Sequence, residues 1–250
     1  MFILARNELY RLFLSPLAWI ILALTQIILA YLFLTHIEFF IQNQARLAAI
    51  PGAPGVTELV AVPLLNNAAL ILLLIAPSIT MRMVAEERRN GSLPLLYSAP
   101  LSMTQITLGK FLGSFSFFLI LLIQFMLMPL SLALGSNIDF ILLGSAFLAL
   151  TLVVASFTAV GLFFSSLSRQ PTIAAISTFA SLFLLWIIDW AGDMQIAENP
   201  ISLFNWLSLP SHFEPLLLGE FHSSDIVYFL LIIITFLILT IRRLDSDRLI

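Results

Sequence analysis

Six long apolar runs constrain the fold of this 250-residue chain more than any other feature. They cover Leu17–Thr35, Leu59–Met81, Phe111–Leu134, Phe140–Leu167, Thr172–Ile188 and Ile226–Ile241. A helix needs about 20 mainly apolar residues to cross the hydrocarbon core of a bilayer. Only 10% of the residues are charged, whereas soluble domains carry roughly 25%. We therefore predict an all-α, multi-pass membrane protein with six transmembrane helices and a single domain, residues 1–250.

The first 16 residues resemble a helix that lies in the membrane interface. Phe2, Leu9, Leu12 and Phe13 alternate with the polar side chains of Arg6, Asn7 and Arg11. This pattern predicts an amphipathic interfacial helix over residues 1–16, ended by Ser15-Pro16. The alternative is that these residues form the first turns of the first span.

The basic residues indicate the orientation of the chain. If both termini lie on one side, ten of the eleven Lys and Arg residues fall on that side, and only Arg46 falls on the other. Cytoplasmic loops carry such an excess of positive charge. We therefore expect both termini, and the charged interval between spans two and three, to be cytoplasmic.

That interval, Met81–Lys110, is where charge gathers in the middle of the chain. The pattern predicts a helix that leaves the membrane through Arg82–Arg89, then a turn at Asn90-Gly91. Ser92 can cap a short helix over Leu93–Ser98, and a new helix should start near Ser102. Residues 82–105 would thus place a short helix on the cytoplasmic face, where a partner could push on it. The alternative is an ordinary charged loop.

The outer segment, residues 191–225, contains two apolar runs that are too short to span. They are Ile201–Leu209 and Phe213–Leu218, separated by Pro210-Ser211, and Trp206 suits an interface. We predict two re-entrant helices, which persist only when they are buried against protein or line a wet cavity. The alternative is a helix pair lying flat on the surface.

Few residues point to chemistry. The sequence has no G-x-x-x-x-G-K-[ST] phosphate loop and no cysteine, so it should not bind ATP in that way. His36, His212 and His222 lack metal-ligand spacing, and we expect no metal and no catalytic group. Glu38, Glu214, Glu220 and Asp225 are interpreted as a solvated outer rim. We expect no cofactor on this chain and no nucleic-acid partner.

Polar residues inside the spans are scarce. They are Gln26, Asn66, Asn67, Gln124 and Asp189. The amides either bond between helices or line a pathway, and Asp189 has either a structural or a functional role. Gly109-x-x-x-Gly113 and Ala155-x-x-x-Ala159 are close-packing patterns, for contacts within the chain or for a dimer seam.

Three motifs give the chain a family resemblance. Asn7-Glu8-Leu9 with Ser15-Pro16-Leu17-Ala18-Trp19 is similar to an opening E-L…S-P-x-a-[YW]. Residues 85–93 and 98–102 with Leu108-Gly109-Lys110 are similar to A-E-E-[KR]-x-x-G-[TS]…[ST]-x-P-[VL]-S…L-G-K, although Pro94 departs from it. Residues 209–229 are similar to S-H-F-[DE]…G…D-[VI]-x-Y-F. The chain resembles permease subunits of type-2 ATP-binding-cassette transporters, nearest the gliding-motility and nitrous-oxide-reductase-maturation permeases.

The resemblance implies a permease in the bacterial cytoplasmic (inner) membrane, most simply an exporter. It implies two permease chains, expected to be a homodimer, and two separate ATPase subunits that hold ATP and Mg²⁺. Contacts to the ATPase would come from Glu86, Glu87, Arg88, Gly91, Leu93, Leu95, Leu96 and Tyr97. Trp206, Pro210, His212, Phe213 and Glu214 would form the re-entrant segment. A non-transporting membrane scaffold is the first alternative; a membrane-embedded lipid-modifying enzyme is the second, although no acid/base or metal cluster is found.

Overall fold

A computed structural model describes residues 1–47, 54–93, 101–193 and 206–248. In these ranges the chain is helical and contains no strand. The main helices are α1 (Phe2–Leu14), α2 (Pro16–Leu47), α3 (Val62–Thr80), α4 (Ala85–Arg89), α6 (Met103–Ser131), α7 (Phe140–Leu167), α8 (Pro171–Asp193), α10 (Leu209–Leu217) and α11 (Ser223–Arg248). A π-helical turn, Thr57–Ala61, precedes α3, and a 3-10 turn, Leu132–Leu134, follows α6.

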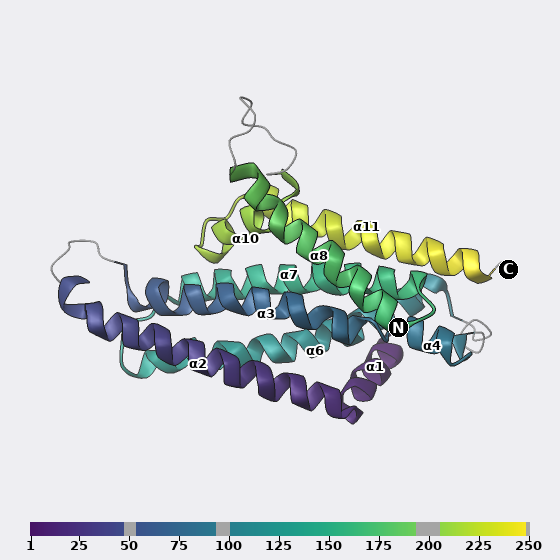
Figure 1. Cartoon of the computed structure of the whole chain (residues 1–250), viewed down its shortest axis with the longest axis horizontal. Helices are drawn as coiled ribbons and strands as arrows, with labels where there is room; N and C mark the ends of the chain where they lie inside the picture. Colours follow the sequence, from purple (N-terminus) through teal and green to yellow (C-terminus); the bar gives the residue numbers. More distant parts are fainter. Residues whose placement is uncertain (48–53, 94–100, 194–205, 249–250) are drawn as a thin grey trace.

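Six helices are long and apolar enough to cross a membrane, which confirms the predicted fold class. The long helices α2, α3, α6, α7 and α11 run along the molecule, and α8 crosses them obliquely (Figure 1). Both ends of the chain lie at the end of the bundle that carries α4 (Figure 1). The termini and the charged interval therefore share one face of the molecule, as the basic residues predicted.

Helix α7 forms the centre of the bundle. It packs against α3, α6, α8, α10 and α11, and its residues Val153–Leu162 are all buried. Helices α2, α8 and α11 expose rows of large apolar side chains instead, including Ile27, Phe183 and Ile234. These rows suit contact with lipid chains, because lipid is as apolar as the side chains themselves.

Small residues let the helices approach closely, which is how packing is achieved when no hydrophobic effect drives helices together. A Cβ added to Gly161 of α7 would lie 2.1 Å from Thr80 Oγ1 of α3. A Cβ added to Gly113 of α6 would lie 2.8 Å from the Ala5 carbonyl oxygen of α1. The Gly109-x-x-x-Gly113 pattern thus serves packing within the chain, against α1.

The N-terminal helix is separate from the first span. Helix α1 ends at Leu14, Ser15 is extended, and α2 begins at Pro16. Ser102 starts α6 with a capping box, in which its Oγ accepts from Gln105 N and the Gln105 side chain accepts from Ser102 N. This confirms the predicted helix start near Ser102, although the helix includes eight residues before the predicted span.

Two predicted boundaries are wrong. The helix expected to continue through Arg82–Arg89 is interrupted by a turn over residues 81–84 before α4 begins. The outer helix expected to start at Phe213 starts at Leu209, because Ser208 caps it by accepting from Ser211 N. Pro210 therefore lies in the first helical turn, where its missing N–H has no cost. The other outer helix, Ile201–Leu209, lies mostly outside the described residues.

Candidate functional site: a charged hub at one end of the bundle

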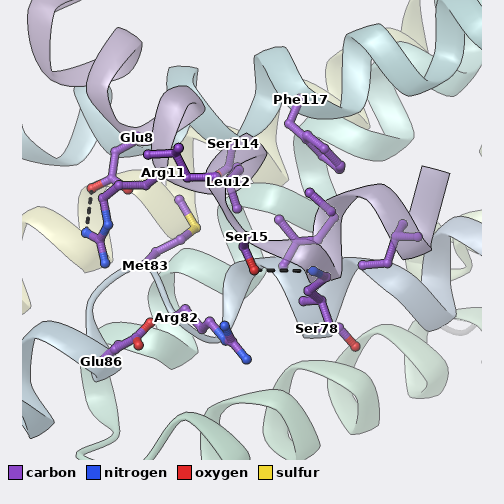
Figure 2. A pocket seen from close by; sticks show the side chains of 15 residues that line it. Glu8, Arg11, Leu12, Ser15, Ser78, Arg82, Met83, Glu86, Ser114 and Phe117 are labelled. Carbon is purple, nitrogen blue, oxygen red and sulfur yellow. Dashed lines mark hydrogen bonds and ion pairs between the residues drawn. The ribbon is translucent and has the colours of Figure 1, made fainter.

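The end of the bundle near the N-terminus is hollowed by a pocket of about 220 Å³ (Figure 2). It lies between α1, the first turns of α2, the end of α3 with the turn that follows, and α6. Charged side chains gather there from segments that are far apart in the sequence. They include Glu8, Arg11, Arg82 and Glu86.

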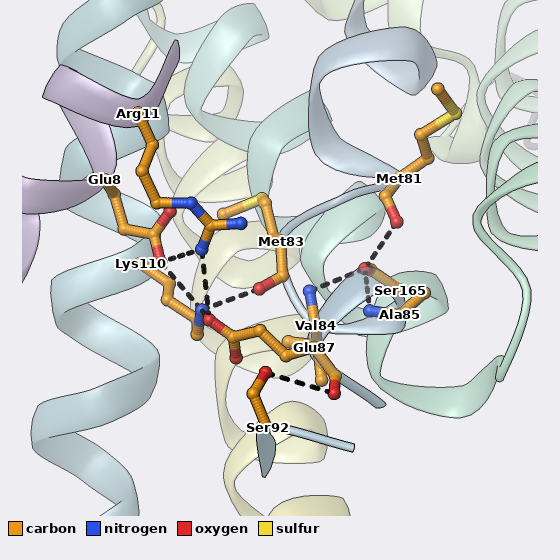
Figure 3. Close-up of polar contacts among 10 residues, drawn as sticks. All are labelled: Glu8, Arg11, Met81, Met83, Val84, Ala85, Glu87, Ser92, Lys110 and Ser165. Atoms are coloured by element: carbon orange, nitrogen blue, oxygen red, sulfur yellow. Dashed lines mark hydrogen bonds and ion pairs between the residues drawn. The ribbon is translucent and has the colours of Figure 1, made fainter. Parts of the chain in front are cut away.

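A serine of α7 holds the turn that interrupts the second span. Ser165 Oγ accepts hydrogen bonds from Val84 N (3.0 Å) and Ala85 N (3.1 Å) and donates one to the Met81 carbonyl (2.9 Å), as Figure 3 shows. A broken helix leaves such backbone groups without partners. The Ser165 hydroxyl supplies partners for Val84 N, Ala85 N and the Met81 carbonyl, so the turn is fixed to α7.

Lys110 bonds to side chains and backbone from three of these segments (Figure 3). Its side chain is 1% exposed, and Nζ donates to Glu8 Oε1 (2.7 Å), Glu87 Oε1 (2.6 Å) and the Met83 carbonyl (2.7 Å). An ammonium group has three donors, so all of them are used. Lys110 of α6 thereby connects α1, the turn after α3, and α4.

Arg11 completes this cluster. Its Nη1 lies 3.3 Å from Glu87 Oε1 and 3.7 Å from Glu8 Oε1. Two cations and two carboxylates alternate, so the cluster of Glu8, Arg11, Glu87 and Lys110 has no formal net charge. We call these four residues the Lys110 cluster.

A second ion pair connects α4 to the last helix. Arg88 pairs with Asp247 of α11, and Arg243 of α11 lies 3.4 Å from the same carboxylate. The segment that follows α3 is therefore bonded to α1 and α6 through the Lys110 cluster, to α7 through Ser165, and to α11 through Asp247.

The turn after α4 has the predicted form. Gly91 has a φ of +69°, which glycine adopts without steric strain, and Ser92 N donates to the Glu87 carbonyl (3.0 Å). Leu93 is buried in a small core with Met83 and Met103. Leu95, Leu96 and Tyr97, which were predicted to form the short helix, lie outside the described residues.

The structure assigns the remaining predicted contact residues to different surroundings. The Glu87 carboxylate points inward to Lys110 and Arg88 pairs with Asp247, whereas Glu86 lines the pocket. Exposed side chains in this segment belong to Arg82, Arg89 and Asn90. Sequence reasoning did not assign roles to Glu8, Lys110, Ser165 or Asp247. A lysine directly before an apolar run was the one available signal, because a charge there needs a partner.

A second polar group lies at α10 and the start of α11. His212 Nδ1 lies 2.7 Å from Asp225 Oδ1 and its Nε2 lies 3.1 Å from the Trp206 carbonyl. The ring stacks on Tyr228 at 4.2 Å between centroids, and Tyr228 donates to the Leu207 carbonyl (2.8 Å). Interpreting Asp225 as part of a solvated rim was wrong, because it is 5% exposed and paired with His212.

The other residues of the predicted re-entrant segment divide between core and surface. Phe213 and Pro210 are buried, and Phe213 lies 6.4 Å from Trp186 of α8 between ring centroids. Trp206 and Glu214 are exposed. Helix α10 thus packs one face against α7, α8 and α11.

The polar residues within the spans make few hydrogen bonds to other helices in the described part of the chain. Asn67 of α3 lies 3.5 Å from His36 of α2, at the limit of a hydrogen bond. In the described part of the chain, no hydrogen bond joins the side chain of Asn66 or Gln124 to another residue. Asp189 belongs to α8.

These features define a class: a multi-pass helical membrane protein in which a charged segment at one end is bonded to several spans. The family model for ABC-2 family transporter proteins matches residues 2–249. The chain belongs to this family, as a membrane-embedded permease subunit of an ATP-binding-cassette transporter that pairs with an ABC ATPase subunit. No curated protein gave a significant match to the chain.

Proposed function

We propose that the chain is the permease of an ATP-driven exporter in the bacterial inner membrane, with both termini and residues 82–105 in the cytoplasm. Two copies would assemble with two ATPase subunits, which hold ATP and Mg²⁺. The motif resemblance favours the subgroup that includes the gliding-motility and nitrous-oxide-reductase-maturation permeases. The apolar interior is compatible with hydrophobic or lipid-linked cargo.

The observation that carries this proposal is the bonding of the 82–93 segment to the spans. A partner that displaces α4 also displaces α1 and α6, because Lys110 bonds to carboxylates on both sides. The same displacement reaches α11 through Asp247. In our proposal, residues 89–100 contact the ATPase, and residues 83–88 transmit its movement.

The interruption at residues 81–84 determines the route of this transmission. Helical hydrogen bonding between α3 and α4 is broken there, so α4 can turn relative to α3. The ion pairs to α1, α6 and α11 and the Ser165 hydrogen bonds to α7 remain as the links to the bundle. ATP can shift the permease between two conformations only by the difference in binding free energy between them. These links allow the movement of the ATPase to reach the spans.

The first prediction separates coupling from folding at the Lys110 cluster. Lys110→Met alone leaves the two carboxylates of the Lys110 cluster to share the one cation Arg11, and it should destabilise the chain by about 3–5 kcal/mol, as breaking a buried pair does. Lys110→Met with Glu87→Gln restores charge balance, since Glu8 and Arg11 can still pair. We expect the double variant to regain stability but not coupling.

The measurement is the ATPase rate of the partner subunit assembled with the permease in nanodiscs, relative to the ATPase alone. The thermal unfolding midpoint of the permease is recorded in parallel. Glu58→Gln, at an exposed carboxylate in the π-helical turn, is the control. A stable double variant with wild-type stimulation would refute the transmission role, and absence of any stimulation by the wild type would favour a scaffold.

A further inference from the structure

The pocket in Figure 2 combines apolar walls with two side chains of opposite charge, the exposed Arg82 and the half-buried Glu86. Its apolar lining consists of Leu12, Leu14, Leu17, Ala18, Ile21, Ile79, Met83 and Phe117. Glu8 and Arg11 also line it, but both belong to the Lys110 cluster. In the described part of the chain, the side chains of Arg82 and Glu86 make no hydrogen bond or ion pair.

The position of the pocket indicates where a ligand would come from. It lies at the corner between α1 and α2, and the first turn of a spanning helix forms one of its walls. Leu14 lines the pocket and is 81% exposed. The pocket is thus bounded by an apolar surface at the depth where a span begins, which is the head-group region of a bilayer.

The unpaired charges indicate the chemistry of the ligand. An arginine guanidinium matches the geometry of a phosphate, and a carboxylate accepts hydrogen bonds from a primary ammonium. In Figure 2, Arg82 and Glu86 lie along one edge of the pocket, across from Leu12 and Phe117. A zwitterionic head group would satisfy both charges while its glycerol and first acyl carbons contact the apolar wall.

We propose that this pocket binds one bilayer phospholipid whose head group carries both a phosphate and a primary ammonium. Arg82 holds the phosphate and Glu86 holds the ammonium. At about 220 Å³, the pocket is smaller than the roughly 300–1,000 Å³ that encloses a whole drug-sized ligand. It therefore takes the head group and the start of the chains, and the rest of the lipid stays in the bilayer.

This chemistry predicts an order of preference. An anionic phospholipid without an ammonium leaves Glu86 unpaired beside a second negative charge. A quaternary ammonium cannot donate a hydrogen bond to the Glu86 carboxylate. Phosphatidylethanolamine should therefore bind better than phosphatidylcholine, and phosphatidylglycerol should bind least.

The test uses the permease chain alone, so its outcome is independent of the proposed coupling to an ATPase. The chain is equilibrated in nanodiscs containing equal amounts of the three lipids with identical acyl chains. Native mass spectrometry after transfer to detergent then counts the lipids that remain bound. We expect one retained phosphatidylethanolamine per chain, at least fivefold more often than either competitor.

Two variants test the separate roles of Arg82 and Glu86 in lipid binding. Arg82→Gln should lower the retention of all three lipids, because each has a phosphate. Glu86→Gln should abolish the preference for phosphatidylethanolamine over phosphatidylcholine without lowering phosphatidylcholine. Arg169→Gln, at an exposed arginine between α7 and α8, is the matched control and should behave as wild type.

A third variant tests the cavity itself. Ser78→Phe fills the pocket from α3 and should remove the bound lipid, whereas Ser116→Phe, at a half-buried serine of α6 outside the pocket, should not. If Ser78→Phe fails to fold, Arg82→Gln and Glu86→Gln still test whether the pocket binds the lipid. Preferential retention of phosphatidylglycerol, or charge variants that match Arg169→Gln, would overturn the proposal.

Discussion

Lys110 shows how a single charge is accommodated inside an apolar helix. Burying an unpaired ammonium is very unfavourable, yet Lys110 is 1% exposed because two carboxylates and a carbonyl take all three of its protons. Its partners come from positions 8, 83 and 87, which are distant in the sequence. A lysine in this place was visible in the sequence, but its partners were not.

Ser165 is the second residue that holds the charged segment in place, and its substitution tests that role directly. Ser165→Ala leaves Val84 N, Ala85 N and the Met81 carbonyl without their partner. A buried unsatisfied group costs about 1–3 kcal/mol, so the thermal unfolding midpoint should fall. ATPase stimulation should fall with it, because α4 loses its anchor on α7.

The neighbouring serine is the matched control. Ser166 is equally buried, but its hydroxyl bonds to the Phe163 carbonyl within its own helix. Ser166→Ala should therefore leave both the midpoint and the stimulation nearly unchanged. Equal effects of the two substitutions would contradict an anchoring role for Ser165.

Helix α1 belongs to the bundle because α6 is narrow where the two helices meet. Gly109 and Gly113 leave room for Leu4, Ala5 and Glu8, and this contact brings Glu8 to Lys110. The amphipathic pattern of residues 1–16 predicted a helix separate from the first span. It did not predict that the helix would pack against the third span.

Gly113→Ala tests this contact. The added Cβ would lie 2.6 Å from Glu8 Cβ and 2.8 Å from the Ala5 carbonyl oxygen, and neither can move away by side-chain rotation. We expect α1 to separate, with a loss of roughly 1–3 kcal/mol typical of overpacking. Hydrogen exchange of the α1 amides should quicken, whereas Gly144→Ala, at a glycine of α7 with no atom within 4 Å of its Cβ site, should leave it unchanged.

The pairing of α10 with α11 depends on His212 and Asp225. Asp225→Asn replaces a charge-assisted bond by a weaker one, and a hydrogen bond to a charged group contributes about 1.5–3 kcal/mol. Amides of α10 should exchange faster in this variant. Asp245→Asn, at an exposed position of α11, is the control. Equal exchange of the α10 amides in both variants would refute the role of the pair.

For the molecule as a whole, the orientation in the membrane is a prediction that rests on the positions of the basic residues. The chain has no cysteine, so a thiol reagent can label only the single cysteine that is introduced. Asn90→Cys lies in the turn after α4 and Gln44→Cys near the far end of α2, and both positions are exposed. An impermeant thiol reagent added to intact cells should label position 44 and spare position 90. Labelling of position 90 from outside would invert the topology and exclude a cytoplasmic ATPase contact there.

The sequence by itself determined the six spans, the helix start at Ser102, the turn at Gly91 and the gathering of both termini with the charged interval on one face. These features depend on runs of apolar residues and on local caps, which act between near neighbours in the chain, and on the distribution of basic residues among its loops, which is read directly from the sequence. Only the tertiary structure decided that the second span breaks at residues 81–84, that Lys110 joins two carboxylates from α1 and α4, and that Asp225 is buried against His212. Each of these depends on a side chain from a remote helix that supplies a hydrogen bond or an opposite charge, and such pairings arise only when the helices pack.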